Sequence, residues 1–305
     1  MVRGQTCLEK DVIIKTSESM KKRTFGGIPK KYANKKSAKI YLTSIPYDGT
    51  STWGKGADKG FQAFLKAADN MELYDIETDS EVYKQGIFMP DPVLEDSSPG
   101  QMFDASYSKE KALLKTDKFL TFFGGEHSIS IGLIKTFYEK YDNLTVLQLD
   151  AHTDLRPSYE GSAYNHACAV YDASQHTNLI QVGIRSMDSS EKKYLNRQKC
   201  FFAQSIKGRQ KWIDDSIELM TEKVYITLDL DVFDPSIMPS TGTPEPGGLN
   251  WYEVTQYLKR VFAEKEVVGF DIVELSPTPD NKAPDFLAAK LYYKMLSYKF
   301  HNNDK

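Results

Sequence analysis

The chain has 305 residues, of which 40% are hydrophobic and 27% are charged, and its formal net charge is −3. This length is enough for one or two domains with a large core. It contains no run of about 18 apolar residues and no apolar signal-peptide core, so we expect neither a membrane span nor a secretion signal. Its three cysteines are widely spaced, which argues against a disulfide framework and favours a reducing, cytoplasmic compartment.

Charge is distributed unevenly along the chain. Residues 1–40 hold 11 Lys or Arg against 3 Asp or Glu, a balance of +8, so the remainder carries about −11. An acidic body argues against nucleic acid as a partner and favours a small cationic substrate. We find no linker after residue 40. The sequence therefore predicts a basic N-terminal extension over residues 1–37 and a single domain over residues 38–305.

Strand-like and helix-like segments alternate from about residue 38 onward. Apolar, β-prone runs predict strands at 39–45, 118–123, 144–149, 178–184, 224–230 and 267–272. Helical patterns occupy 60–72, 106–116, 129–140, 189–197, 207–221, 251–263 and 284–300. Residues 74–104 are expected to be irregular. This alternation predicts an α/β protein with a mostly parallel sheet of about eight strands and helices on both faces.

Two helix starts carry a recognisable signal. Ser128 is expected to cap the helix that follows it. Asn250 precedes another predicted helix, and Glu253 stands three residues later, as in a capping box.

Potential metal ligands follow the predicted strand at 144–149. Asp150, His152 and Asp154 are spaced two residues apart. Side chains alternate in extended chain, so these three can project to one side. Ligand sites in α/β proteins lie at the carboxyl ends of the strands, which makes a metal site there a specific hypothesis. Taken alone, the same pattern also fits a polar loop.

Three other predicted strands end in similar residues. His127 follows one strand after a Gly-Gly turn, Asp229 and Asp231 end a second, and Glu274 ends a third. Each alone has an ordinary explanation, such as a capping Asp or a solvated Glu. Because the ends of parallel strands open on one edge of a sheet, four such ends together favour a shared site.

Two histidines and four aspartates make six candidate ligands. Carboxylate and imidazole together suit Mn²⁺, with Fe, Co or Zn as alternatives. The four carboxylates match the charge of two divalent ions, and carboxylates can bridge two ions. Such a pair could deprotonate a bridging water and generate hydroxide near neutral pH.

Five motifs, in this order, resemble the ureohydrolase family of arginases and agmatinases. They are Gly-Gly-Glu-His127, Asp150-Ala-His-Thr-Asp154, Asp229-Leu-Asp-Val-Phe-Asp-Pro, Thr241-Gly-Thr-Pro-Glu-Pro-Gly-Gly-Leu249 and Asp271-Ile-Val-Glu-Leu-Ser-Pro277. The resemblance runs from about Ile45 to the last helix. It implies a three-layer α/β/α arginase-like fold, two Mn²⁺ per subunit, and hydrolysis of a guanidinium group to urea and an amine.

The resemblance also implies a role for each matching residue. His127, Asp150, Asp154 and Asp229 should hold one ion. Asp150, His152, Asp229 and Asp231 should hold the other, so that Asp150 and Asp229 bridge. In that mechanism a metal-bridging hydroxide attacks the guanidinium carbon.

Three residues complete the implied catalytic set. His166 falls at the position of the family's proton-shuttling histidine and Glu274 at that of its guanidinium-binding carboxylate. Asp154 should stabilise the tetrahedral intermediate and help His166 to supply protons to the leaving amine. A packed core histidine is the alternative interpretation of His166.

The segment after Asp154 resembles an agmatinase-like branch and lacks the Ser-Gly-Asn pattern of arginases. Tyr159, Glu160 and Tyr164 could bind a cationic tail, although a solvated loop fits equally well. Agmatine is therefore the expected substrate and putrescine the product, a step of polyamine biosynthesis. Arginine, guanidinobutyrate, longer agmatine derivatives and formiminoglutamate remain open.

Two departures from the family pattern concern other regions. Ser240 replaces a common Gly, and the loop 53–61 lacks the usual Arg and Gly-Pro. The resemblance therefore leaves pocket shape and subunit contacts open, but not the metal site. The resemblance suggests a homotrimer or homohexamer. Alternatives of another class are a metal-binding protein without turnover and a mononuclear zinc deacetylase.

Overall fold

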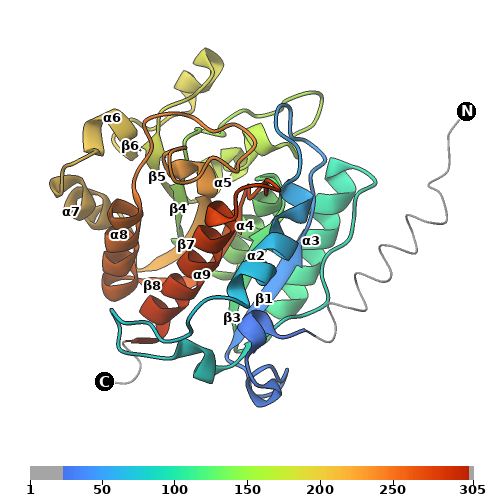
Figure 1. Cartoon of the computed structure of the whole chain (residues 1–305). Coiled ribbons are helices and arrows are strands. Elements are labelled where there is room, and N and C mark those ends of the chain that lie inside the picture. The colour runs from blue at the N-terminus through green and yellow to red at the C-terminus, as the bar shows by residue number, and fades with distance from the viewer. Residues whose placement is uncertain (1–22, 302–305) are drawn as a thin grey trace, which may run out of the picture.

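One eight-stranded sheet organises the molecule, and all of its strand pairs are parallel. The computed structural model describes residues 23–301 (Figure 1). The strand order is β2-β1-β3-β8-β7-β4-β5-β6. The strands are β1 (Ile40–Ile45), β2 (Ile87–Phe88), β3 (Phe119–Gly124), β4 (Thr145–Leu149), β5 (Asn178–Ile184), β6 (Cys200–Phe202), β7 (Lys223–Asp229) and β8 (Glu266–Val273).

Helices cover both faces of this sheet and make the three layers (Figure 1). One layer contains α2 (Gly60–Ala68), α7 (Lys211–Glu218), α8 (Trp251–Glu264) and α9 (Ala283–His301). The other contains α3 (Pro99–Leu113), α4 (Ile129–Lys140) and α5 (Tyr171–His176). The short α6 (Ala203–Ile206) lies next to β5 and β6. The predicted α/β class, parallel sheet and arginase-like layering are confirmed.

The central strands are buried along their length because helices cover both sides. Every residue of β4 is buried, and so are six of the seven residues of β7. Parallel strands in this position are expected to be continuously apolar, as Val146 and Leu147 illustrate. The polar residues within them, such as Gln148 and Thr227, are therefore exceptions that need hydrogen-bond partners.

Several predicted boundaries were wrong for identifiable reasons. Helix α3 begins at Pro99, seven residues before the predicted start, because the Ser98 side chain accepts a hydrogen bond from Gln101 N–H and proline suits the first turn. Ser128 does not cap α4, since its hydroxyl donates to Glu126 instead. Asn250 forms the predicted capping box with Glu253, which is confirmed.

The segment around residue 190 also differs from its prediction. A 3-10 helix at Ser189–Lys193 replaces the helix expected at 189–197. The edge strand β6 follows it and had no counterpart in the prediction. Its three residues are too few to show a periodic pattern.

Residues 1–22, most of the predicted basic extension, lie outside the described residues. Residues 23–37 are described and contact the domain. The Phe25 ring is fully buried and packs near the rings of Phe64, Tyr292 and Tyr293. The division at residue 37 therefore stays a prediction. Within residues 23–301, no helix is long and apolar enough to cross a membrane.

Candidate metal centre and active site

The predicted ligands converge because their four strands are neighbours in the sheet. Strands β3, β8, β7 and β4 lie side by side, and their carboxyl ends meet at one edge. His127 follows β3, Glu274 follows β8, and Asp229 is the last residue of β7. Asp150 directly follows β4. The structure thus brings together residues from four separate parts of the sequence.

One cluster surrounds the imidazole of His127. Its Nδ1 lies 3.1 Å from Asp150 Oδ2, 3.0 Å from Asp154 Oδ2 and 3.4 Å from Asp229 Oδ2. All four side chains are buried. This is the set predicted for the first ion.

A second cluster shares Asp150 with the first. His152 Nδ1 lies 2.9 Å from Asp231 Oδ2 and 3.6 Å from Asp150 Oδ1. The two oxygens of Asp150 therefore face different histidines, which is the arrangement a bridging carboxylate requires. Asp150, His152 and Asp231 offer ligand atoms within 4.8 Å of one another.

Neighbouring groups hold these ligands in orientation. Gln148 Nε2 donates to Asp150 Oδ2 at 2.7 Å, and His127 Nε2 lies 2.9 Å from Thr227 Oγ1. Asp154 has a φ of 49° and Glu274 a φ of 69°, in the left-handed region that non-glycine residues avoid. Such backbone strain is concentrated at functional sites.

The buried carboxylates perturb both histidines strongly. Burial alone would lower the pKa of His127, but the carboxylates of Asp150, Asp154 and Asp229 raise it well above its usual range. Burial likewise opposes charge on His152, yet Asp231 and Asp150 raise its pKa. In the metal-free protein both imidazoles are therefore protonated at neutral pH.

The pKa values of the carboxylates shift in opposite directions. Burial and the charge of Asp150 raise the pKa of Asp154 to about 7. Burial, then Asp231 and Asp150, raise that of Asp229 well above its usual value. The pKa of Asp150 is lowered, because His127 and His152 outweigh its burial. The protein alone thus leaves an excess of negative charge that only bound cations or protons can offset.

The residues fit a pair of divalent cations. Within the described residues, the buried Nδ1 of His127 makes no hydrogen bond of acceptable geometry, although three carboxylates lie within 3.4 Å. A buried polar atom without a hydrogen bond requires an explanation, and coordination of a metal ion by Nδ1 provides one. Carboxylate and imidazole donors without a thiolate suit manganese-type ions.

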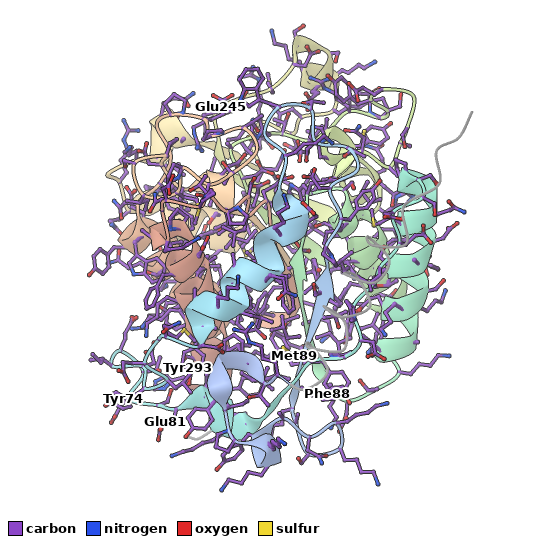
Figure 2. The ribbon with its side chains drawn as sticks, turned by 45° about the vertical axis from the view of Figure 1, so that its right-hand side comes forward. Tyr74, Glu81, Phe88, Met89, Glu245 and Tyr293 are labelled. Atoms are coloured by element: carbon purple, nitrogen blue, oxygen red, sulfur yellow. The ribbon has the colours of Figure 1, made fainter. Side chains whose placement is uncertain are left out.

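A cavity of about 320 Å³ opens above the two clusters. His166, Glu274 and Tyr159 line it together with all of the cluster residues except the fully buried Asp150. Figure 2 shows Glu245 at the end of the molecule opposite Tyr74, and its Oε1 lies 3.8 Å from His152 Nε2. The cavity therefore brings His166 and Glu274 beside five of the six predicted metal ligands.

Two of the predicted substrate residues are not brought to this cavity. Glu160 is exposed, and the Tyr164 ring stacks on Phe103 at 4.3 Å between centroids. Sequence reasoning also missed residues that do line the cavity. Asp188 stands close after β5, a fifth strand that ends at the same edge, and that position was the available signal.

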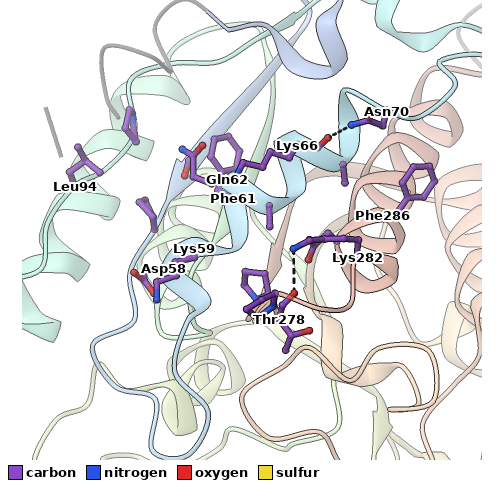
Figure 3. A pocket seen from close by; sticks show the side chains of 18 of the residues that line it. Asp58, Lys59, Phe61, Gln62, Lys66, Asn70, Leu94, Thr278, Lys282 and Phe286 are labelled. Atoms are coloured by element: carbon purple, nitrogen blue, oxygen red, sulfur yellow. Dashed lines mark hydrogen bonds and ion pairs between the residues drawn. The ribbon is translucent and has the colours of Figure 1, made fainter. Parts of the chain in front are cut away.

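A larger groove of about 1070 Å³ lies along α2 and the start of α9 (Figure 3). Its walls include the exposed apolar side chains of Leu94 and Phe286 and the buried Phe61. Lys282 Nζ donates to the carbonyl of Thr278 at its edge. None of the described residues that line it is a histidine. The smaller cavity is therefore the candidate active site.

Known proteins with similar sequences are ureohydrolases. The model of the arginase family matches residues 38–297. An N(1)-aminopropylagmatine ureohydrolase of Synechocystis is 34% identical over 272 residues, covering 86% of this chain and 89% of the relative. An agmatinase of Pyrococcus horikoshii is 30% identical over 267 residues, covering 86% and 92%.

A solved structure shares the whole fold. The agmatine ureohydrolase of Thermoplasma volcanium superposes with a TM-score of 0.81 at 29% identity, covering 94% of this chain and 99% of that one. The chain therefore belongs to the arginase family of ureohydrolases, in its agmatinase-like branch.

Proposed function

We propose that this protein hydrolyses an agmatine-type guanidine to urea and an amine, using two Mn²⁺ ions. The observation that carries the proposal is one cavity, lined by residues of both Asp/His clusters, by His166 and by Glu274. His127, Asp150, Asp154 and Asp229 would hold one ion, and the second would be held by Asp150, His152, Asp229 and Asp231. When bound, the ions supply Lewis-acid activation of water.

Glu274 would orient the guanidinium. Its Oε1 accepts a hydrogen bond from His127 N–H at 2.7 Å, which fixes the carboxyl group in the cavity wall. Burial and the neighbouring Glu126 raise the pKa of Glu274 well above its usual range. A planar cationic guanidinium would offset that penalty and restore the charged form, with two N–H donors facing one carboxylate.

His166 and Asp154 would move protons. Burial lowers the pKa of His166 to about 4, and His127 and His152 add to the effect. A neutral imidazole at pH 7 can accept a proton from water and deliver it to the leaving amine. Asp154, with a pKa of about 7 in the metal-free protein, borders the same cavity.

The cavity favours a cationic tail over an amino-acid end. Asp188 lies at its lining, and Glu245 faces His152 close by. The carboxylates of Asp188 and Glu245 would attract an amine and disfavour a carboxylate. Relatives named for agmatine and for N(1)-aminopropylagmatine support both as substrates. Arginine, 4-guanidinobutyrate and formiminoglutamate are the alternatives within the family.

The decisive experiment measures urea release after manganese loading. We expect urea from agmatine or from N(1)-aminopropylagmatine, and at least about tenfold lower kcat/KM for arginine and 4-guanidinobutyrate, since each carries a carboxylate. Urea from none of the four substrates contradicts the proposed function. Tight metal binding without turnover would favour the non-catalytic alternative.

Metal binding is expected to release protons. The raised pKa values of His127 and His152 mean that both bind a proton at neutral pH in the metal-free protein. A metal ligand must be the neutral imidazole, so each ion displaces protons and apparent affinity rises with pH. Calorimetric titration in two buffers of different ionisation enthalpy measures this release. Identical heats in both buffers would contradict it.

We also propose that the enzyme acts in the cytoplasm as a homo-oligomer of three or six subunits. Cys168 and Cys200 are both buried and free, which supports a reducing compartment. Size-exclusion chromatography with light scattering measures the subunit number, and a monomer at micromolar concentration would contradict the oligomer.

A further inference from the structure

Thr50 connects His166 to a buried carboxylate. The residue lies in the loop after β1 and is 6% exposed. Its Oγ1 lies 2.9 Å from Glu126 Oε1 and 3.1 Å from His166 Nδ1. The same oxygen accepts the backbone N–H of His166 at 3.0 Å. Three segments distant in sequence therefore meet at one hydroxyl.

The position of the hydroxyl hydrogen follows from the partners of Glu126. Each oxygen of this buried carboxylate accepts a backbone N–H, Oε1 from Thr50 at 3.2 Å and Oε2 from Ser128 at 2.7 Å, and the hydroxyls of Thr50 and Ser128 lie 2.9 and 2.8 Å from Oε1. A carboxylate so surrounded acts as an acceptor. A threonine hydroxyl has a single hydrogen, so Thr50 donates it to Glu126.

With its hydrogen directed to Glu126, Thr50 can only accept from His166. One lone pair takes the backbone N–H and the other faces Nδ1. A neutral imidazole carries one N–H, and the hydrogen bond made by one ring nitrogen decides which of the two is protonated. Nδ1 must then bear the hydrogen, and Nε2 is left with the lone pair.

We propose that Thr50 is a positioning residue that fixes His166 as the Nδ1–H tautomer, so that Nε2 is the nitrogen that accepts the proton during turnover. The catalytic role of this tautomer rests on the proposed function, whereas the assignment of the tautomer does not. Glu126 acts one step further away, because it orients the threonine hydroxyl. Loss of this kind of tautomer control lowers the rate of His-dependent hydrolases without moving the histidine.

An aromatic ring also lies next to the imidazole. The Tyr159 ring packs edge-on against His166 at 6.2 Å between centroids. The Arg156 guanidinium lies 4.2 Å over that tyrosine ring and pairs with Glu191. Tyr159 offers the imidazole a ring edge or face and no polar atom at this contact, so the hydrogen bond to Thr50 is the contact that distinguishes the two tautomers.

The test compares Thr50→Val with Thr50→Ser. Valine keeps the shape and removes the acceptor, whereas serine keeps the hydroxyl. We expect Thr50→Val to lower kcat about 10- to 100-fold, the lower part of the range for proton-transfer catalysis, with KM and metal content unchanged. Thr50→Ser should stay within about threefold of the parent enzyme and keep its pH profile. Thr116→Val, the same change at an exposed site far from the cavity, is the control.

Nitrogen-15 NMR of the zinc-loaded protein reads the tautomer directly, since zinc is diamagnetic. The chain has five histidines, and His166→Asn identifies the signal of His166. A protonated Nδ1 in the parent protein and in Thr50→Ser supports the proposal. A protonated Nε2 in the parent overturns it, as does full kcat in Thr50→Val. If the parent releases no urea, the proposed function fails, and the NMR result still decides the tautomer. The parent spectrum also decides it if Thr50→Val does not fold.

Discussion

Asparagine in place of Asp150 is expected to abolish metal pairing and to lower urea release by about a thousandfold or more, because several kcal/mol of metal-dependent stabilisation are lost. Asp150 offers one oxygen to each cluster, and asparagine keeps the shape but removes the charge and one acceptor. Gln148 Nε2 would then face an amide in place of a carboxylate. Elemental analysis after dialysis should find fewer than about two ions per chain.

A matched control separates the metal effect from the loss of a charge. Asp117→Asn makes the same chemical change at a side chain that is 86% exposed. It should retain two ions and full activity. An Asp150→Asn protein that binds two ions and turns over like the parent would refute the bridging role.

Glutamine in place of Glu274 is expected to lower kcat/KM about 100-fold, which is the loss of a charge-assisted, two-point hydrogen bond. The ligand clusters do not include Glu274, so metal content should stay at the parent level. Steady-state kinetics with agmatine measure the loss. A parent-like kcat/KM would show that the guanidinium binds elsewhere.

The same substitution should stabilise the metal-free protein. The pKa of Glu274 is raised well above its ordinary value on folding, so the native state holds its proton more tightly than the unfolded chain. Stability from this group is present at low pH and is lost as pH rises from about 4, the ordinary carboxyl value, toward the folded pKa. Glu274→Gln removes that loss. The Tm of metal-free Glu274→Gln should therefore exceed that of the metal-free parent by an amount that grows from acidic to neutral pH.

Local sequence patterns predicted most of the fold but not every boundary. The runs that became β4, β5 and β7 are apolar because both faces are covered, so composition alone identifies them. The start of α3 was missed because prolines dominate the segment before it, although Ser98 and Pro99 are themselves a start signal. Ser128 was misjudged because Glu126, only two residues before it, accepts its hydroxyl hydrogen.

The site was predictable where its residues lie at the ends of strands that the sequence itself indicates. His127, Asp150 and Asp229 lie where the edge of a parallel sheet requires them. The contacts of Thr50 were not predictable, because they join it to Glu126 and His166, residues at no fixed spacing from it in sequence. The position of Tyr164 depends likewise on its stacking partner Phe103, a contact with an otherwise unrelated helix.

The strand order has a consequence for how the protein acquires its activity. Strand β8, from the last part of the chain, inserts between β3 and β7, so the central pairs join segments about 40 to 150 residues apart. Contacts of such long range form slowly, and no N-terminal fragment that lacks residues 266–273 has a complete sheet centre. We therefore expect metal uptake to occur only after the whole domain has been synthesised and folded, with the ions then acting as late stabilisers of the native state.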